Sequence, residues 1–222
     1  MSKAASYFDV DGTLVKSNLV HPLIFFMSNQ QNPMRALGSL LKAGLRVPKL
    51  IKSELIDRGS FNELLFEGYA GMSEDRLLEL ADEAFDSVVR PALYPEAKDL
   101  VASVKSAGHR VVLVSGSPDF ILHRLARLLD ADEVIGNRLE FRDGMATGRI
   151  KRPLVAGPEK ARIIKDHAKE HGYDLDDCAA YSDSMSDVPM LSVVGRPAVV
   201  NPDFRLRALA NTHRWPILDF RN

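Results

Sequence analysis

The sequence has a single cysteine, no long hydrophobic run and almost no net charge. One cysteine in 222 residues, Cys178, cannot form an internal disulfide or a cysteine-rich metal site, and this usage is typical of a cytoplasmic protein. The longest apolar stretch, residues 19–27, is too short to cross a bilayer, so no stable membrane insertion is expected. A net charge of −1 provides no field that would favour nucleic acid as a partner.

The sequence also lacks internal repeats, low-complexity tracts and glycine- or serine-rich linkers, and its composition is that of a globular protein. Residues 4–8 predict a short buried strand, and from residue 95 onward helical and strand patterns alternate, which is typical of a parallel sheet covered on both faces. Residues 16–92 carry helical patterns and no convincing strand. We therefore predict an α/β protein with a doubly wound parallel sheet, formed by residues 1–15 and 93–222, and a helical cap inserted at 16–92.

Local signals predict where several elements begin and end. Helical pieces are expected within 34–45 and 50–56, and a hairpin turn at Asp143-Gly144. Three further helices are expected to start at side-chain caps. These caps are a capping box of Ser60 with Glu63, then Ser73, and then Ser117 for a helix over 118–129. A helix over 158–171, stopped by Gly172, carries a lysine in its first turn, Lys160.

Two acids follow the first predicted strand, where Gly12 allows the chain to turn. Asp9 and Asp11 can both reach one small volume, and two like charges so close together are costly unless a cation or a shared proton compensates them. A turn in which Asp11 and Gly12 serve only backbone geometry is the alternative interpretation. Other strand ends must decide between the two.

Polar side chains also follow two later strands. The strand over 109–114 ends in Ser115-Gly116-Ser117-Pro118, whose hydroxyl and N–H groups at a helix start suit a phosphate. The strand over 179–181 is followed by Asp183 and Asp187. Because ligands of parallel sheets bind at the carboxyl ends of the strands, we expect these groups to converge. The cation of Lys160 opposes the helix dipole at its position, which indicates an anionic group nearby.

These groups resemble, in order, the four motifs of the haloacid dehalogenase superfamily, which are D-x-D-G-T, a strand-terminal serine or threonine, a lysine and a late acidic pair. The helical insertion between the first two motifs occupies the cap position of one large group of that superfamily. Within it, the nearest likeness is to the phosphoserine-phosphatase-like branch, subfamily IB. The resemblance covers nearly the whole chain and implies a phosphatase with a Rossmann-like core.

The resemblance implies a mechanism with an aspartyl-phosphate intermediate. Asp9 would be the nucleophile, and Asp11 would protonate the leaving alcohol and then activate water. Ser115 and the Gly116 N–H would hold phosphate oxygens, while Lys160 would neutralise charge.

The resemblance also implies Mg²⁺ as the cofactor. Its ligands would be Asp9, the Asp11 backbone carbonyl and Asp183, and Asp187 would orient Lys160 or a metal-bound water. Relatives often have asparagine where Ser186 stands, so Ser186 is expected either to contact phosphate or to cap a helix.

The substrate is expected to be a small or amphiphilic phosphomonoester. Phosphoserine phosphatases usually carry a glutamate after the first motif and an arginine in the cap, whereas this chain has Asn18 near the first position and no arginine between Gly59 and Gly71. The apolar residues of 19–27 suggest a less polar leaving group. Alternatives left open are a phosphoserine phosphatase proper, a non-catalytic binding or regulatory protein with this fold, and a phosphotransferase.

One further motif lies at the end of the helix over 158–171. His167-Ala168-Lys169-Glu170-His171 matches the H-x-x-E-H pattern of one metalloprotease group, but no third metal ligand is in view. Histidines and lysines in a last helical turn complement the helix dipole, so we expect a solvated helix end there.

Overall fold

The computed structural model describes residues 4–18, 20–29 and 58–220. They form a seven-stranded sheet in the order β4-β3-β2-β1-β5-β6-β7, in which every pair is parallel except β3 with β4. The predicted fold class is therefore confirmed. The strands are β1 (Ala5–Phe8), β2 (Arg110–Pro118), β3 (Glu133–Arg142), β4 (Met145–Lys151), β5 (Ala179–Ser182), β6 (Arg196–Val200) and β7 (Ile217–Leu218).

The central strand, β1, alternates its side chains between two cores. Phe8 belongs to the core that includes residues of α5 and α6, whereas Tyr7 belongs to the core that includes residues of α7, α8 and α9. The sheet is thus covered on both faces. These helices are α5 (Pro95–Ser106), α6 (Asp119–Leu129), α7 (Pro158–His171), α8 (Val188–Leu191) and α9 (Phe204–His213).

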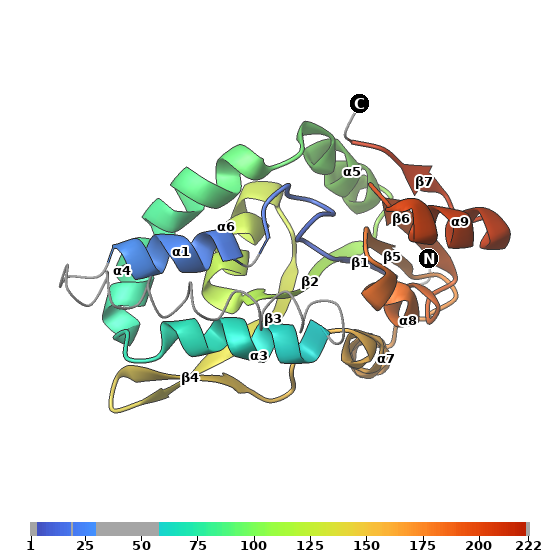
Figure 1. Ribbon diagram of the computed structural model, residues 1–222. Coiled ribbons are helices and arrows are strands. Elements are labelled where there is room, and N and C mark those ends of the chain that lie inside the picture. The colour runs from blue at the N-terminus through green and yellow to red at the C-terminus, as the bar shows by residue number, and fades with distance from the viewer. Residues whose placement is uncertain (1–3, 19, 30–57, 221–222) are drawn as a thin grey trace.

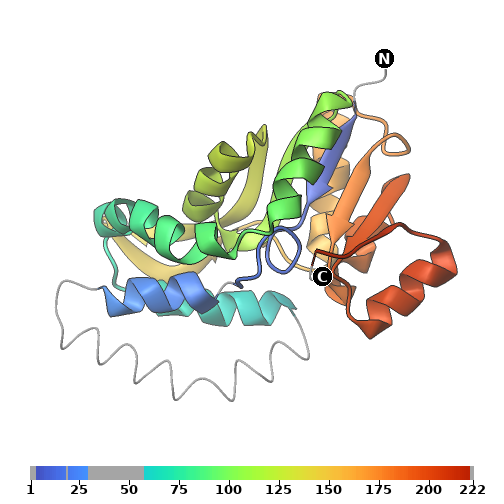
Figure 2. The same cartoon turned by 90° about the horizontal axis from the view of Figure 1, so that it is seen from above.

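The described elements between the first two motifs are all helical. They are α1 (Val20–Ser28), α3 (Arg58–Phe66), η1 (Glu67–Tyr69), α4 (Glu74–Ala84), η2 (Phe85–Val89) and η3 (Arg90–Ala92). Figures 1 and 2 show α1, α3 and α4 gathered at one side of the molecule, away from β6, β7 and α9. The predicted helical pieces at 34–45 and 50–56 lie outside the described residues.

Aromatic packing joins these helices to α6, one of the helices that cover the sheet. The ring of Phe26 in α1 lies 5.8 Å from Tyr69 and 5.7 Å from Phe120 of α6, measured between centroids. Phe26 and Met27 are almost fully buried in the core shared with α6. The apolar stripe of residues 20–27 therefore stabilises the packing of the helices on one another. Within the described residues, no helix is both long and apolar enough to cross a membrane.

Several local predictions are confirmed and others are wrong. Ser73 caps α4 by accepting a hydrogen bond from the Arg76 N–H, and the Asp143-Gly144 turn joins β3 to β4. Strand β3 runs without a break from Glu133 into that hairpin. Ser60 lies inside α3, which has already begun at Arg58, and α6 has no side-chain cap because Ser117 is still part of β2.

Candidate active site

The first acidic pair lies where β1 ends, at the centre of the sheet. Asp9 is only 6 % exposed, and its N–H donates a hydrogen bond of 2.9 Å to the carbonyl oxygen of Tyr181 in β5. Gly12, with φ = +90°, turns the chain back immediately after the pair. The short strand therefore delivers two carboxylates to the carboxyl edge of the sheet, as the sequence predicts.

Lys160, in the first turn of α7, joins two of the acids. Its Nζ donates hydrogen bonds of 2.7 Å to Asp9 Oδ1 and 2.8 Å to Asp187 Oδ2, and all three side chains are nearly buried. Asp187 Oδ2 also accepts a hydrogen bond of 2.8 Å from the Ser182 hydroxyl. The anionic groups that the position of Lys160 indicates are therefore these two carboxylates.

Asp183 completes the carboxylate group beside Asp9. The hydroxyl of Thr13 lies 3.2 Å from both Asp9 Oδ2 and Asp183 Oδ1, so it can donate to either. A Cβ on Gly12 would lie 2.1 Å from Asp183 Oδ2, so only glycine leaves room for this carboxylate. The motif D-x-D-G-T thus supplies the hydroxyl that Asp9 and Asp183 share and the space that Asp183 needs.

Asp11 is held by two serines at the end of β2. Ser115 and Ser117 donate hydrogen bonds of 3.0 Å and 2.8 Å to Asp11 Oδ2, and the Ser117 N–H donates to Ser115 Oγ at 3.0 Å. The predicted phosphate contact of the Ser115 hydroxyl thus has a competing partner, since the donor already serves Asp11. The predicted cap, Ser117, also holds this carboxylate.

Burial sets the protonation of these acids. It raises the pKa of Asp9 to about 6, with Lys160 acting in the opposite direction. It raises the pKa of Asp183 to about 7, with the charges of Asp9 and Asp187 adding to the rise. Burial also raises the pKa of Asp11, against the two serine hydrogen bonds. For Lys160, burial lowers the pKa, but its two carboxylate partners raise it above the ordinary value.

Asp9, Asp11, Lys160 and Asp187 line a pocket between the sheet edge and α3, whereas Asp183 is not part of its described lining. A Cβ on Gly116 would lie 2.3 Å from Asn62 Nδ2, so α3 packs closely against the Ser115-Gly116-Ser117 segment at its glycine. Asn62 is 1 % exposed, and its Oδ1 accepts no hydrogen bond from the described residues. The described lining consists of Asp9, Asp11, Arg58, Asn62, Gly116, Val155, Ala156, Lys160, Ser184, Ser186 and Asp187.

Two of the predicted substrate-binding residues behave differently from one another. Ser186 lines the pocket and lies 2.9 Å, between hydroxyl oxygens, from Ser184, whose side chain caps the following turn. Asn18 is exposed, and its Oδ1 accepts a hydrogen bond of 3.1 Å from the Val20 N–H at the start of α1. Asn18 is absent from the described pocket lining, so the structure gives it a capping position instead.

Sequence reasoning missed three polar residues at the site. Arg58 and Asn62 lie one turn apart on α3 and both line the pocket. Asn62 could have been noticed as the polar member of an otherwise apolar buried face. Asn137 is fully buried, donates to the Gly116 carbonyl at 2.9 Å and accepts from the Val155 N–H at 2.7 Å. It thereby fixes two segments of the pocket wall, and no local pattern marks it.

Comparison with known proteins identifies the family. Residues 7–192 match the family described as haloacid dehalogenase-like hydrolase. A probable phosphatase of Mycobacterium tuberculosis is 34 % identical over 99 % of this chain and 76 % of its own length. A phosphoserine phosphatase of the same organism is 33 % identical over 98 % of this chain and 71 % of its own length.

Solved structures share the fold. A Bordetella pertussis protein of unknown function superposes with a TM-score of 0.84 at 26 % identity, covering 99 % of this chain and 100 % of that one. A substrate-bound phosphoserine phosphatase superposes with a TM-score of 0.72 at 18 % identity, covering 98 % of this chain and 93 % of that one. The chain therefore belongs to the haloacid dehalogenase-like hydrolase family, among relatives that are named phosphatases.

Proposed function

We propose that this protein hydrolyses a small phosphate monoester, with Asp9 as the nucleophile and Mg²⁺ as its cofactor. The observation that carries the proposal is the pair of 2.7 Å and 2.8 Å hydrogen bonds from Lys160 to Asp9 and Asp187. A buried ammonium in this position holds the attacking carboxylate and offsets part of the charge that a phosphate brings. A protein that only binds its ligand has no need of a nucleophile such as Asp9, held by Lys160, next to a second aspartate, Asp11, that can act as an acid.

The two first-motif acids divide the reaction between them. The Asp9 carboxylate attacks phosphorus and forms an aspartyl-phosphate, while the bond to the alcohol oxygen breaks and that oxygen takes a proton from Asp11. Asp11 then takes a proton from water as the water oxygen attacks phosphorus, which releases phosphate and restores Asp9. The raised pKa of Asp11 favours its protonated form at the first step, and Ser115 and Ser117 keep it in place.

The donor set suits Mg²⁺. Asp9 and Asp183 share the Thr13 hydroxyl, and the burial of both carboxylates raises their pKa values because no cation among the described side chains fully offsets their charge. Hard oxygen donors of this kind are those that Mg²⁺ prefers. Asp9, Asp183 and the Asp11 carbonyl would hold the ion, which supplies further neutralisation of phosphate charge. Asp187 is better placed to orient Lys160, which it contacts.

The pocket favours a small polar leaving group over an amphiphilic one. Its described lining is mainly charged or polar, and the apolar residues Pro22, Phe26 and Met27 of α1 are buried instead, the last two in the core shared with α6. The expectation that the apolar residues of 19–27 contact the substrate is therefore unsupported for these three. Leu19 lies outside the described residues, and Phe25 lies in a separate surface groove.

Phosphoserine is the second candidate substrate. Arg58 lines the pocket just before the interval from Gly59 to Gly71 in which the sequence has no arginine, and it could pair with a substrate carboxylate. Two of the relatives that are about one third identical or slightly less are named phosphoserine phosphatase, which supports this candidate. The absence of the glutamate typical of that enzyme, where Asn18 stands, argues against it.

The decisive experiment measures phosphate release from phosphoserine, sugar phosphates, nucleotides, lysophosphatidic acid and a generic aryl phosphate, with Mg²⁺ and with EDTA. We expect Mg²⁺-dependent release, fastest from one of the small polar classes. Preference for lysophosphatidic acid would overturn the proposed substrate class. No release from any substrate would contradict hydrolysis, and transfer of phosphate to an added alcohol in place of water would identify a phosphotransferase.

A further inference from the structure

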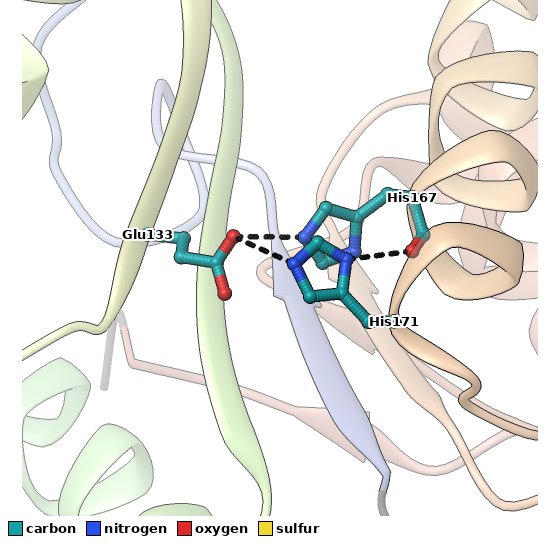
Figure 3. Close-up of side chains that lie close together, drawn as sticks. All are labelled: Glu133, His167 and His171. Atoms are coloured by element: carbon teal, nitrogen blue, oxygen red, sulfur yellow. Dashed lines mark hydrogen bonds and ion pairs between the residues drawn. The ribbon is translucent and has the colours of Figure 1, made fainter.

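A second cluster of side chains that can bind metal lies at the amino end of the parallel strands, whereas Asp9 lies at their carboxyl end. Glu133 is the first residue of β3, and His167 and His171 lie in the last two turns of α7. One ligand atom from each of the three lies within 4.8 Å of the others. Figure 3 shows the Glu133 carboxylate pointing toward both imidazoles. The predicted solvated helix end is therefore wrong for His167, which is 9 % exposed, and a third ligand candidate does exist.

The distances suit a single ion. Glu133 Oε2 lies 2.9 Å from His167 Nε2 and 4.0 Å from His171 Nε2. Zinc-to-ligand distances near 2.1 Å place tetrahedral ligand atoms about 3.4 Å apart, between these two values. The two histidines, spaced i and i+4, present their rings on one helix face, with centroids 4.2 Å apart. Small rotations of side chains would bring the three atoms around one ion.

Hydrogen bonds behind the rings orient them for metal binding. His171 Nδ1 donates to the His167 carbonyl oxygen at 2.9 Å, so its neutral ring keeps the lone pair on Nε2, the atom that faces Glu133. His167 Nδ1 shares a hydrogen bond of 3.0 Å with the Tyr7 hydroxyl. Metal-binding histidines commonly use their second nitrogen in this way. Neither imidazole thus needs a new partner on its far side.

The orientation of the carboxylate and the helix dipole suit a cation at Oε2. Arg110 donates a hydrogen bond of 3.3 Å to the other Glu133 oxygen, Oε1, and so helps to hold the carboxylate in place. The last turn of α7 carries the negative end of the helix dipole, which favours a positive charge there. His171 is partly exposed, with 36 % of its side chain accessible, which gives solvent access to this end of the cluster.

We propose that Glu133, His167 and His171 bind a divalent transition-metal ion, for which zinc is the best match, with solvent as the fourth ligand. Two imidazoles and one carboxylate suit zinc and its neighbours, whereas Mg²⁺ prefers a shell of oxygens. The ion would tie α7 to the start of β3. Because the first turn of α7 carries Lys160, this second site braces the helix that reaches the acidic pocket.

The test is zinc binding by the chelator-stripped protein in excess Mg²⁺, which is added to occupy the acidic pocket proposed above as the Mg²⁺ site. Isothermal titration should show one tightly bound Zn²⁺ per chain, weakened about 100-fold or more in His171→Ala and in Glu133→Gln. His213→Ala is the matched control, because His213 is also an exposed histidine in the last turn of a helix and stacks on an aromatic ring. Its zinc affinity should equal that of the wild type.

Two further readouts separate this site from the catalytic one. Zinc should raise the Tm of the wild type and of Asp183→Asn, but not that of His171→Ala. Absence of tight zinc binding by the wild type would overturn the proposal. So would an unchanged affinity in both His171→Ala and Glu133→Gln, or loss of the tight site in Asp183→Asn, which would place the zinc among the catalytic acids.

Discussion

The ammonium group of Lys160 lies 2.7 Å from Asp9 Oδ1, although the two residues are 151 positions apart in the sequence. The side chains of Lys160 and Asp9 are 6 % and 8 % exposed. Such a contact exchanges hydration for a direct charge interaction, so either partner alone would be a buried, uncompensated charge.

Replacing Lys160 by methionine should destabilise the protein strongly. Asp9 and Asp187 would face each other without their shared cation, and loss of one partner of a buried ion pair costs about 3–5 kcal/mol. Urea unfolding of the metal-free protein would measure the change in free energy of unfolding. Lys165→Met, on an exposed position of the same helix, is the control and should change it little. An equal stability of the two variants would contradict the geometry.

Asp9→Asn should remove hydrolysis while keeping the fold. An amide is a far weaker nucleophile than a carboxylate, and we expect turnover to fall roughly 10⁴-fold or more. Phosphate release gives the rate, and near-ultraviolet circular dichroism checks the fold. Asp143→Asn is the matched change at the hairpin turn, where φ is +50° and asparagine is well tolerated, and it should be as active as the wild type. Wild-type rates in Asp9→Asn would refute the assigned nucleophile.

Without Mg²⁺, stability should fall as the pH rises from about 4 to about 7. The folded protein holds protons on Asp9 and Asp183 with pKa values of about 6 and about 7, against 3.8 as the reference value. The native state therefore binds more protons than the unfolded chain across this window, and each proton lost on raising the pH costs stability.

Thermal unfolding in EDTA over a pH series measures this effect. Asp183→Asn should show a shallower decline in Tm, because one of the two groups no longer titrates. Mg²⁺ should raise the wild-type Tm most at the upper end of the window. A metal-free protein whose Tm rises with pH in this range would contradict the raised pKa values.

Asn62→Ala should reduce kcat/KM for the preferred substrate about 3-fold to 10-fold. The buried Oδ1 accepts no hydrogen bond from the described residues, so a donor on the leaving group could reach it, and one such bond is worth about 0.5–1.5 kcal/mol. The rate with a generic aryl phosphate, which lacks that donor, should change less. Asn211→Ala, at an exposed position of α9, is the control. Equal losses on both substrates would show a structural role only.

Asn137→Ala should destabilise the protein by about 2–4 kcal/mol, since it leaves the buried Gly116 carbonyl and Val155 N–H without their partner. Turnover at saturating substrate should also fall, because both segments line the pocket. Denaturant unfolding and steady-state rates measure the two effects. Asn211→Ala, at an exposed position of α9, should alter neither. A stability equal to that of the control would mean that water replaces the lost amide.

Local patterns predicted the parts of the fold that depend on neighbouring residues. Helix α7 runs over the predicted Pro158–His171 because proline fits its first turn and Gly172 adopts the left-handed conformation after its last. The positions of the acids at the ends of β1 and β5 were also predicted, because these acids follow short apolar strands in the sequence. The position of Lys160 in α7 indicated an anionic neighbour, but the choice of Asp9 and Asp187 as its partners followed only from the family resemblance, because no local pattern relates the three positions.

The missed features depend on contacts between distant segments. Serine is a common helix cap, but the Ser117 hydroxyl donates its hydrogen bond to Asp11, 106 positions away. The sequence does not show Glu133 as a partner of His167, because only the fold brings the first residue of β3 next to the last turns of α7. Arg58 escaped attention because α3 begins before the cap that Ser60 was expected to form. In each case the place of the polar side chain depends on tertiary packing, which local sequence patterns do not describe.

Helix α7 carries Lys160 near one end and His167 and His171 near the other. The length of the segment between them is therefore constrained. One residue inserted or deleted between Lys160 and His167 would rotate the two ends against each other by about 100°. Either the ammonium would leave Asp9 or the imidazoles would leave Tyr7 and Glu133. Substitutions at the exposed positions between them, Arg162, Lys165 and Asp166, carry no such penalty, so this segment should tolerate changes of residue far better than changes of length.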